Sequence, residues 1–285
     1  MSERLKDEIA IITGSTHGIG RSVAIMFAEQ GASVVVTGRD AGAGAEVIQR
    51  VYEAGGKGVF VRADLLDPEA GATIVSETLQ SFGRPTILIN NAGSTDLVRD
   101  GTDRAMSEID DASWSRVLEV NLTGPMRVTR AALREMIPAR RGAIVNVSSL
   151  AARVGVPGVD AYTAAKGAIE ALTRSLAVEY SSYGIRCNCI QVHLVQVVDE
   201  RKGRAFLDPG IDERVKRTIL TRGGRPSDVA GAALFLASRE AGFVTGIVLP
   251  LDGGASAVSG MPWATPRPSS ADESAGQEQS WSSTT

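Results

Sequence analysis

The chain has 285 residues, of which 43% are hydrophobic and 22% charged, values typical of a globular protein with room for a sizeable core. Thirty Lys and Arg against 33 Asp and Glu give a net charge of -3, without the basic block that tracks a phosphate backbone. No apolar run approaches the roughly 20 residues that cross a bilayer, and residues 1–8 are too charged for a signal peptide. We therefore expect a cytoplasmic protein with neither a nucleic-acid nor a membrane partner.

Short apolar runs alternate with helical patterns along the chain. The runs lie at residues 9–12, 34–36, 58–61, 87–89 and 143–147, with two more near 187–192 and 246–249. Between them, apolar residues recur at the three-to-four spacing of helices in segments 21–29, 69–82, 124–137 and 164–180. This alternation predicts a doubly wound, Rossmann-like α/β fold, with a seven-stranded parallel sheet covered by helices on both faces.

One domain accounts for most of the chain. We find no internal repeat or linker within residues 5–258, and we predict a single domain over residues 1–260. Residues 261–285 are rich in Pro, Ser, Thr, Glu and Gln, so they are predicted to form a disordered tail. Cys187 and Cys189 share one face of a predicted strand and are poorly placed to bridge each other. Two buried thiols are expected, without a metal site.

A glycine-rich turn follows the first predicted strand and opens a helix. Glycines allow a tight turn there and let backbone N–H groups approach a pyrophosphate at the positive end of the helix. A plain strand-to-helix turn would look similar, but the position at the first such junction favours a dinucleotide site. The candidate cofactor-binding residues of this turn are Gly14, Ser15, Thr16, His17, Gly18, Ile19 and Gly20.

The end of the second strand bears on the choice of cofactor. Gly38 stands where an NAD site usually has a carboxylate for the adenosine ribose. Arg39 follows, and its guanidinium suits bidentate capture of a 2′-phosphate, which favours NADP(H) over NAD(H). In the alternative, Arg39 is a solvated loop cation and Asp40 binds the ribose, which would restore NAD(H).

The third and fourth strands also end in candidate cofactor residues. Asp64 and Leu65 could line an adenine pocket, although a surface loop would look the same. Asn91, Ala92 and Gly93 end the fourth strand with small and amide residues, which suit a backbone that passes close to a ligand.

A candidate proton-transfer set lies in the second half of the chain. Tyr162 and Lys166 are one helical turn apart and so share a helix face, with Ser149 just after a strand and Asn121 near a helix end. Together with the glycine-rich turn and Asn90–Gly93, these residues resemble, in order and spacing, the short-chain dehydrogenase/reductase family in its compact form. Segments 224–230 and 245–254 extend the resemblance over residues 5–258.

The resemblance implies an oxidoreductase dependent on NADP(H) or NAD(H), which interconverts a carbonyl and an alcohol by hydride transfer, such as a ketone or 3-oxoacyl reductase. It makes Tyr162 the general acid in reduction and the base in oxidation, while Lys166 favours the phenolate and holds the nicotinamide ribose. Ser149 would hydrogen-bond the substrate oxygen, and Asn121 would anchor a water of a proton relay. It also implies the sheet order 3-2-1-4-5-6-7 and a homotetramer or homodimer.

The chain departs from the family pattern after the sixth strand. Val192, His193 and Val197 replace the Pro, Gly and Thr that the family uses around the cofactor. His193 is a candidate extra acid or base, although such a histidine more often fills a loop. We expect residues 94–113 to border the substrate mouth and residues 194–221 to form a lid that is mobile without ligand.

The altered loop also leaves a second hypothesis open, because a fold alone does not establish activity. In this alternative the chain is a non-catalytic nucleotide-sensing or scaffold protein on the same fold. The substrate itself is not identified by the sequence.

Overall fold

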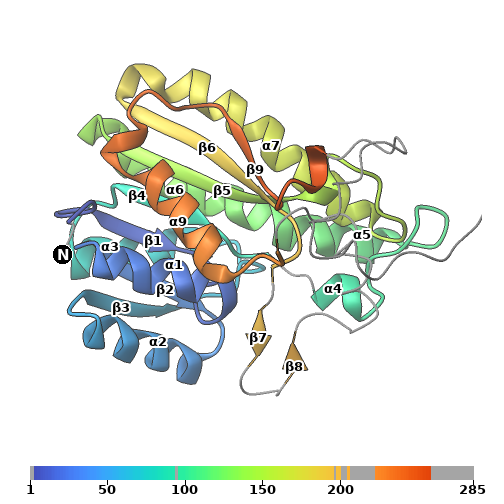
Figure 1. Cartoon of the computed structure of the whole chain (residues 1–285), viewed down its shortest axis with the longest axis horizontal. Coiled ribbons are helices and arrows are strands. Elements are labelled where there is room, and N and C mark those ends of the chain that lie inside the picture. The colour runs from blue at the N-terminus through green and yellow to red at the C-terminus, as the bar shows by residue number, and fades with distance from the viewer. Residues whose placement is uncertain (1–2, 94–95, 196, 200–203, 206–221, 258–285) are drawn as a thin grey trace, which may run out of the picture.

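The computed structural model describes residues 3–93, 96–195, 197–199, 204–205 and 222–257, and its main feature is a seven-stranded parallel sheet (Figure 1). The strand order is β3-β2-β1-β4-β5-β6-β9, which confirms the predicted sheet and its order. The strands are β1 (Ile9–Ile12), β2 (Ser33–Gly38), β3 (Lys57–Arg62), β4 (Ile87–Asn90), β5 (Gly142–Ser149), β6 (Ile185–Val192) and β9 (Val248–Leu251). Beside it, β7 (Val198–Asp199) and β8 (Arg204–Ala205) form a small antiparallel pair.

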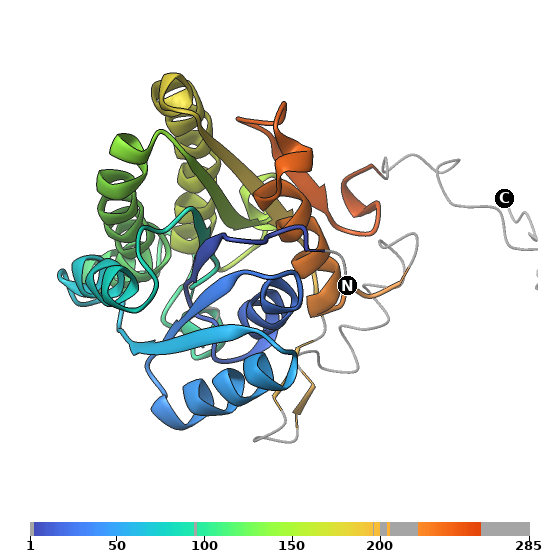
Figure 2. The same ribbon diagram turned by 90° about the vertical axis from the view of Figure 1, so that its left-hand side faces the viewer.

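Helices cover both faces of the sheet, as Figure 2 shows in end view. One face packs against α1 (Gly18–Glu29), α2 (Ala41–Glu53) and α9 (Pro226–Ala237). The other packs against α3 (Ala70–Ser81), α6 (Gly124–Ala139) and α7 (Asp160–Tyr180). Beyond the carboxyl ends of the strands lie the short helices α4 (Asp96–Arg99) and α5 (Asp111–Leu118).

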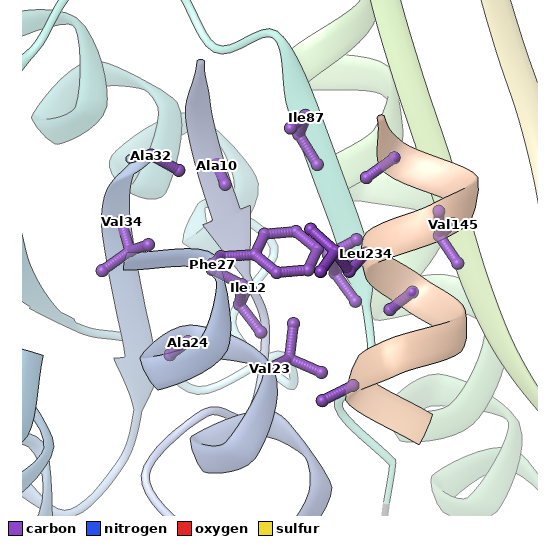
Figure 3. Close-up of a cluster of buried hydrophobic side chains, with 14 of the residues drawn as sticks. Ala10, Ile12, Val23, Ala24, Phe27, Ala32, Val34, Ile87, Val145 and Leu234 are labelled. Atoms are coloured by element: carbon purple, nitrogen blue, oxygen red, sulfur yellow. The ribbon is translucent and has the colours of Figure 1, made fainter. Parts of the chain in front are cut away.

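Two apolar clusters form the core, one on each face of the sheet. Along β1, Ala10 and Ile12 belong to one cluster and Ile11 to the other, because successive side chains of a strand point to opposite faces. Phe27 of α1 is fully buried and lies between the sheet and Leu234 of α9 (Figure 3). Burial on both faces explains why the strands read as continuous apolar runs.

Several predicted boundaries differ from the observed ones by a few residues. Helix α7 begins at Asp160, shortly before Tyr162 and ahead of the apolar pattern of residues 164–180, and β9 begins two residues later than predicted. Gly246 has φ +78, in the left-handed region, so the extended strand begins only after it. The predicted tail, residues 261–285, and much of the predicted lid lie outside the described residues.

Candidate active site

The glycine-rich turn packs too closely for side chains at its glycine positions. A Cβ on Gly14, which has φ +63, would lie 2.9 Å from Ala92 Cα, and one on Gly20 would lie 2.4 Å from the Gly14 carbonyl oxygen. Asn91 braces the turn, because its Nδ2 donates to the carbonyl oxygens of Thr13 and Gly14, each at 3.0 Å. The Asn91 side chain thus fixes the backbone of the glycine-rich turn.

The start of α1 fits an anionic group. His17 is the N-cap, but its side chain caps no backbone N–H, and the first turn holds no acidic residue. The first N–H groups of a helix need an acceptor, and the helix dipole favours a negative one. The turn therefore fits the pyrophosphate of a dinucleotide.

The end of β2 contains three residues that bear on the adenosine ribose. A Cβ on Gly38 would lie 2.6 Å from Thr16 Cγ2, so a larger residue at this position would require the Thr16 side chain to move. Asp40 caps α2, where its carboxylate accepts a hydrogen bond from Ala43 N at 2.9 Å. Arg39 is exposed between them.

The residues after β3 have separate roles. Leu65 is buried in the core against α6, since a Cβ on Gly124 would lie 2.7 Å from Leu65 Cβ. Asp64 is exposed, and its carboxylate accepts a hydrogen bond from Leu66 N at 3.1 Å, which fixes the turn. Of the two, Asp64 is the residue whose side chain is exposed.

The fold brings the four candidate catalytic side chains to one end of the sheet. Ser149 ends β5, while Tyr162 and Lys166 lie in the first two turns of α7. Ser149 lowers the pKa of Tyr162 as a hydrogen-bonding neighbour, so the two side chains lie close together. The Lys166 ammonium donates to the Val147 carbonyl oxygen at 3.0 Å and lies 5.6 Å from the centroid of the Tyr162 ring.

Asn121 lies in a π-helical turn, Glu119–Thr123, between α5 and α6. Such turns widen a helix locally and occur often at functional sites. Asn121 Nδ2 donates to Val117 O at 3.0 Å, and its Oδ1 faces Gly93. A Cβ on Gly93 would lie 2.9 Å from Asn121 Oδ1 and 3.3 Å from Lys166 Nζ, so both polar atoms approach the same glycine.

Burial shifts the proton affinities of the two central groups. The pKa of Tyr162 is raised by burial, and its hydrogen bond with Ser149 opposes this rise. Burial also lowers the pKa of Lys166 to about 8. Each shift disfavours the charged form of its group, so Tyr162 keeps its proton at neutral pH while the pKa of Lys166 moves closer to neutrality.

The loop after β6 is tied to its surroundings. His193 N donates to Leu251 O at 3.3 Å, and Val195 pairs with Gly224. A Cβ on Gly18 would lie 3.1 Å from Val197 Cγ1, so the Val197 side chain covers the start of α1. Burial lowers the pKa of the His193 imidazole, although the charge of Asp252 acts in the opposite direction.

Sequence reasoning missed one buried residue beside the site. Asp103 is 2% exposed, and its carboxylate accepts hydrogen bonds from Ala161 N at 3.1 Å and from Tyr162 N at 2.8 Å. It lies within the polar stretch 94–113, and no local pattern links it to a helix that begins 57 residues later. This contact is a property of the tertiary structure.

Comparison with known proteins agrees with this geometry. Residues 14–256 match the family model described as enoyl-(acyl carrier protein) reductase. The 3beta-hydroxysteroid dehydrogenase of Mediterraneibacter gnavus is 33% identical over 88% of this chain and 95% of that protein. The 3-oxoacyl-acyl-carrier-protein reductase of Chlamydia trachomatis is 38% identical over 89% of this chain and 99% of that protein.

A solved structure extends the likeness to three dimensions. A putative short-chain alcohol dehydrogenase from Sinorhizobium meliloti superposes with a TM-score of 0.82 and 34% identity, over 90% of this chain and 99% of that one. The chain belongs to the short-chain dehydrogenase/reductase family. It is an NAD(P)(H)-dependent oxidoreductase that acts on CH–OH or carbonyl groups, and the scaffold alternative is not favoured.

In the part of the chain that the structure describes, no helix is long and apolar enough to cross a membrane.

Proposed function

We propose that this protein is an NADP(H)-dependent carbonyl reductase or alcohol dehydrogenase in which Tyr162 transfers the proton. The observation that carries the proposal is the convergence of three side chains, because the Lys166 ammonium lies 5.6 Å from the centroid of the Tyr162 ring and Ser149 lowers the pKa of Tyr162 as a hydrogen-bonding neighbour. One carbonyl oxygen can accept from both hydroxyls, which is the geometry that general acid catalysis requires.

When bound, the nicotinamide would supply the hydride for reduction of the carbonyl carbon. Tyr162 donates its hydroxyl proton to the carbonyl oxygen, while Ser149 hydrogen-bonds that oxygen as negative charge develops on it. In oxidation, Tyr162 accepts the proton of the alcohol, and the positive charge of Lys166 favours the phenolate. Asn121 then anchors a water through which the proton reaches solvent, and Lys166 holds the ribose hydroxyls.

The preference for NADP(H) is supported by the end of β2. Gly38 carries no carboxylate for the ribose of NAD(H), and the Thr16 side chain packs against it. Asp40 already accepts the Ala43 N–H as the cap of α2. The exposed Arg39 carries the charge and donors that suit a 2′-phosphate.

Several side chains form the proposed cofactor site with Arg39. The turn that includes Gly14, Ser15, Thr16, His17, Gly18, Ile19 and Gly20 would hold the pyrophosphate through backbone N–H groups. The segments after the carboxyl ends of β3 and β4 would contribute Asp64, Leu65, Asn91, Ala92 and Gly93. Of these, Leu65 and Asn91 would support the site from inside the protein, since Leu65 is buried and Asn91 hydrogen-bonds the glycine-rich turn.

The substrate proposal follows from the two named relatives, a hydroxysteroid dehydrogenase and a 3-oxoacyl reductase. We propose a ketone or 3-oxoacyl compound and its secondary alcohol as the substrate class.

We also propose a cytoplasmic location and a homotetramer or homodimer. Val178 on α7 and Phe243 near β9 are 80% and 104% exposed, and apolar side chains this exposed suit contact with another subunit.

The test is a turnover assay over a panel of substrates. Purified protein is incubated with NADPH or NADH and ketosteroids, cyclic ketones or 3-oxoacyl thioesters, and the loss of nicotinamide absorbance is followed, with Tyr162→Phe as the control. Turnover that requires Tyr162 supports the proposal. Cofactor binding without turnover of any panel member would favour the nucleotide-sensing alternative.

A further inference from the structure

The start of the catalytic helix has a cap that comes from a distant part of the chain. The N-cap residue of α7 is Val159, whose side chain has no acceptor for the first N–H groups of the helix. Asp103 takes this role instead, since its two carboxylate oxygens accept from Ala161 N and Tyr162 N. A buried carboxylate is favourable at this position because of these two donors and the helix dipole.

A second contact joins the same two segments in the opposite direction. Asp160, the first residue of α7, accepts a hydrogen bond from Met106 N at 2.7 Å. The loop 103–106 is thus attached to α7 at both of its ends. We call these two contacts, made by Asp103 and Asp160, the carboxylate clasp.

The clasp connects the Tyr162 backbone to segment 94–113, which we expect to border the substrate mouth. Asp103 N donates to Leu97 O of α4 at 2.8 Å. Leu97 packs in an apolar cluster with Val117 and Ala161, and the Tyr162 ring lies against the same cluster. Met106, at the other end of the loop, has a side chain that is 60% exposed. Tyr162 is therefore fixed through its backbone by Asp103 and through its ring by this cluster.

We propose that Asp103 is a positioning residue for Tyr162, which couples the loop 103–106 to the acid–base group of the site. The carboxylate holds Tyr162 N, and so the Tyr162 hydroxyl stays next to Ser149. The inference rests on the proposed role of Tyr162. Small displacements of a catalytic group cost on the order of 10²-fold in rate, so a cap that fixes this backbone acts directly on turnover.

The test measures Asp103→Ala in two backgrounds. In the wild-type background we expect kcat to fall about 10- to 100-fold, with the Kd for NADPH unchanged in a fluorescence titration. In the Tyr162→Phe background the same substitution should change the residual rate less than about 3-fold, because Asp103 acts through the hydroxyl that is already absent. A purely structural role would reduce the rate by the same factor in both backgrounds, and that result would overturn the proposal.

The matched control is Asp110→Ala. Asp110 is also a helix cap, since its carboxylate accepts from Ser113 N at 2.7 Å at the start of α5, but it makes no contact with α7 among those described. We expect Asp110→Ala to lower Tm and to leave kcat unchanged. If it lowers kcat as much as Asp103→Ala does, loss of a cap alone explains the effect and the proposal fails.

Asp103→Asn keeps the test decisive if the alanine variant does not fold. An amide oxygen can accept from Tyr162 N but leaves Ala161 N without its carboxylate partner, so we expect a kcat between those of wild type and the alanine variant. A kcat equal to that of wild type would contradict the proposal. Full activity of Tyr162→Phe, by contrast, would overturn the proposed function itself.

Discussion

Ser149 and Tyr162 come from different elements, the end of β5 and the first turn of α7, and the fold brings them close enough for Ser149 to lower the pKa of Tyr162 by hydrogen bonding. Burial around this pair raises the pKa of Tyr162, so the phenol holds its proton at neutral pH. A protonated phenol beside a second hydroxyl is a donor pair for one substrate oxygen. This relationship motivates the first prediction.

Replacing Tyr162 by Phe should remove almost all turnover. The substitution deletes the transferable proton and little else, so we expect kcat to fall by about 10²- to 10⁴-fold, with NADPH affinity and Tm nearly unchanged. Steady-state kinetics and thermal unfolding measure these effects. Tyr180→Phe, at the far end of the same helix, is the matched control and should be fully active. Undiminished turnover in the Tyr162 variant would remove this residue from the mechanism.

Replacing Arg39 by Ala should weaken NADPH binding by about 10-fold or more and NADH binding much less, because only NADPH offers a 2′-phosphate for a charge-assisted contact. Kd values from fluorescence titration with both cofactors test this. Arg50→Ala, on the exposed side of α2, serves as the control. Equal losses for the two cofactors, or a wild-type preference for NADH, would mean that Arg39 does not select the cofactor.

Replacing Val197 by Thr should tighten NADPH binding about 3- to 10-fold, since one added hydrogen bond contributes roughly 1 kcal/mol. The Val197 side chain lies over Gly18 at the start of α1, where a hydroxyl of the same shape can donate to a cofactor phosphate. Isothermal titration gives the affinity. The family resemblance is the reason to expect a hydroxyl here. Unchanged or weaker binding would show that the native loop binds the cofactor by other contacts.

Replacing Lys166 by Met should stabilise the fold while it abolishes turnover. The pKa of Lys166 is about 8 in the folded protein, below its value near 10.4 in an unfolded chain. Burial of the charged form therefore destabilises the fold fully below pH 8, and this effect declines as pH rises from 8 toward 10.4. We expect a gain of about 2 kcal/mol at pH 7, or roughly 4–8 °C in Tm.

The pH dependence separates this effect from a general change in packing. The gain in Tm from Lys166→Met should shrink between pH 7 and pH 9, whereas Lys57→Met at an exposed position should change Tm little at either pH. Differential scanning fluorimetry at the two pH values is sufficient. A gain that grows with pH, or a loss at pH 7, would contradict the assigned cause of the low Lys166 pKa.

Two glycine-to-alanine variants should have opposite effects. A Cβ on Gly20 would lie 2.4 Å from the Gly14 carbonyl oxygen, so Gly20→Ala should lower Tm and weaken cofactor binding. Gly231 in α9 has open space around its Cα, and Gly231→Ala should stabilise the helix by about 0.5–1 kcal/mol. A Gly20 variant with native Tm and native cofactor affinity would show that the turn can relax.

The sequence was sufficient for those parts of the protein that depend on local pattern. Apolar runs such as 9–12 and 143–147 predict buried strands, because a strand covered on both faces needs apolar residues at every position. The glycine pattern after the first apolar run predicts the tight turn at the first strand–helix junction, because the backbone conformation of that turn requires glycine. Tyr162 and Lys166 share a helix face by spacing alone.

Tertiary structure decided what depends on contacts between distant segments. Asn91 braces the glycine-rich turn and Thr16 occupies the space next to Gly38, and neither contact has a local signal. The cap that Asp103 provides to α7 spans 57 residues, so it exists only once the loop 103–106 and α7 meet. Burial sets the pKa shifts of Tyr162 and Lys166, and burial is a property of the packed core, because desolvation depends on every element around a group and not on its neighbours in sequence.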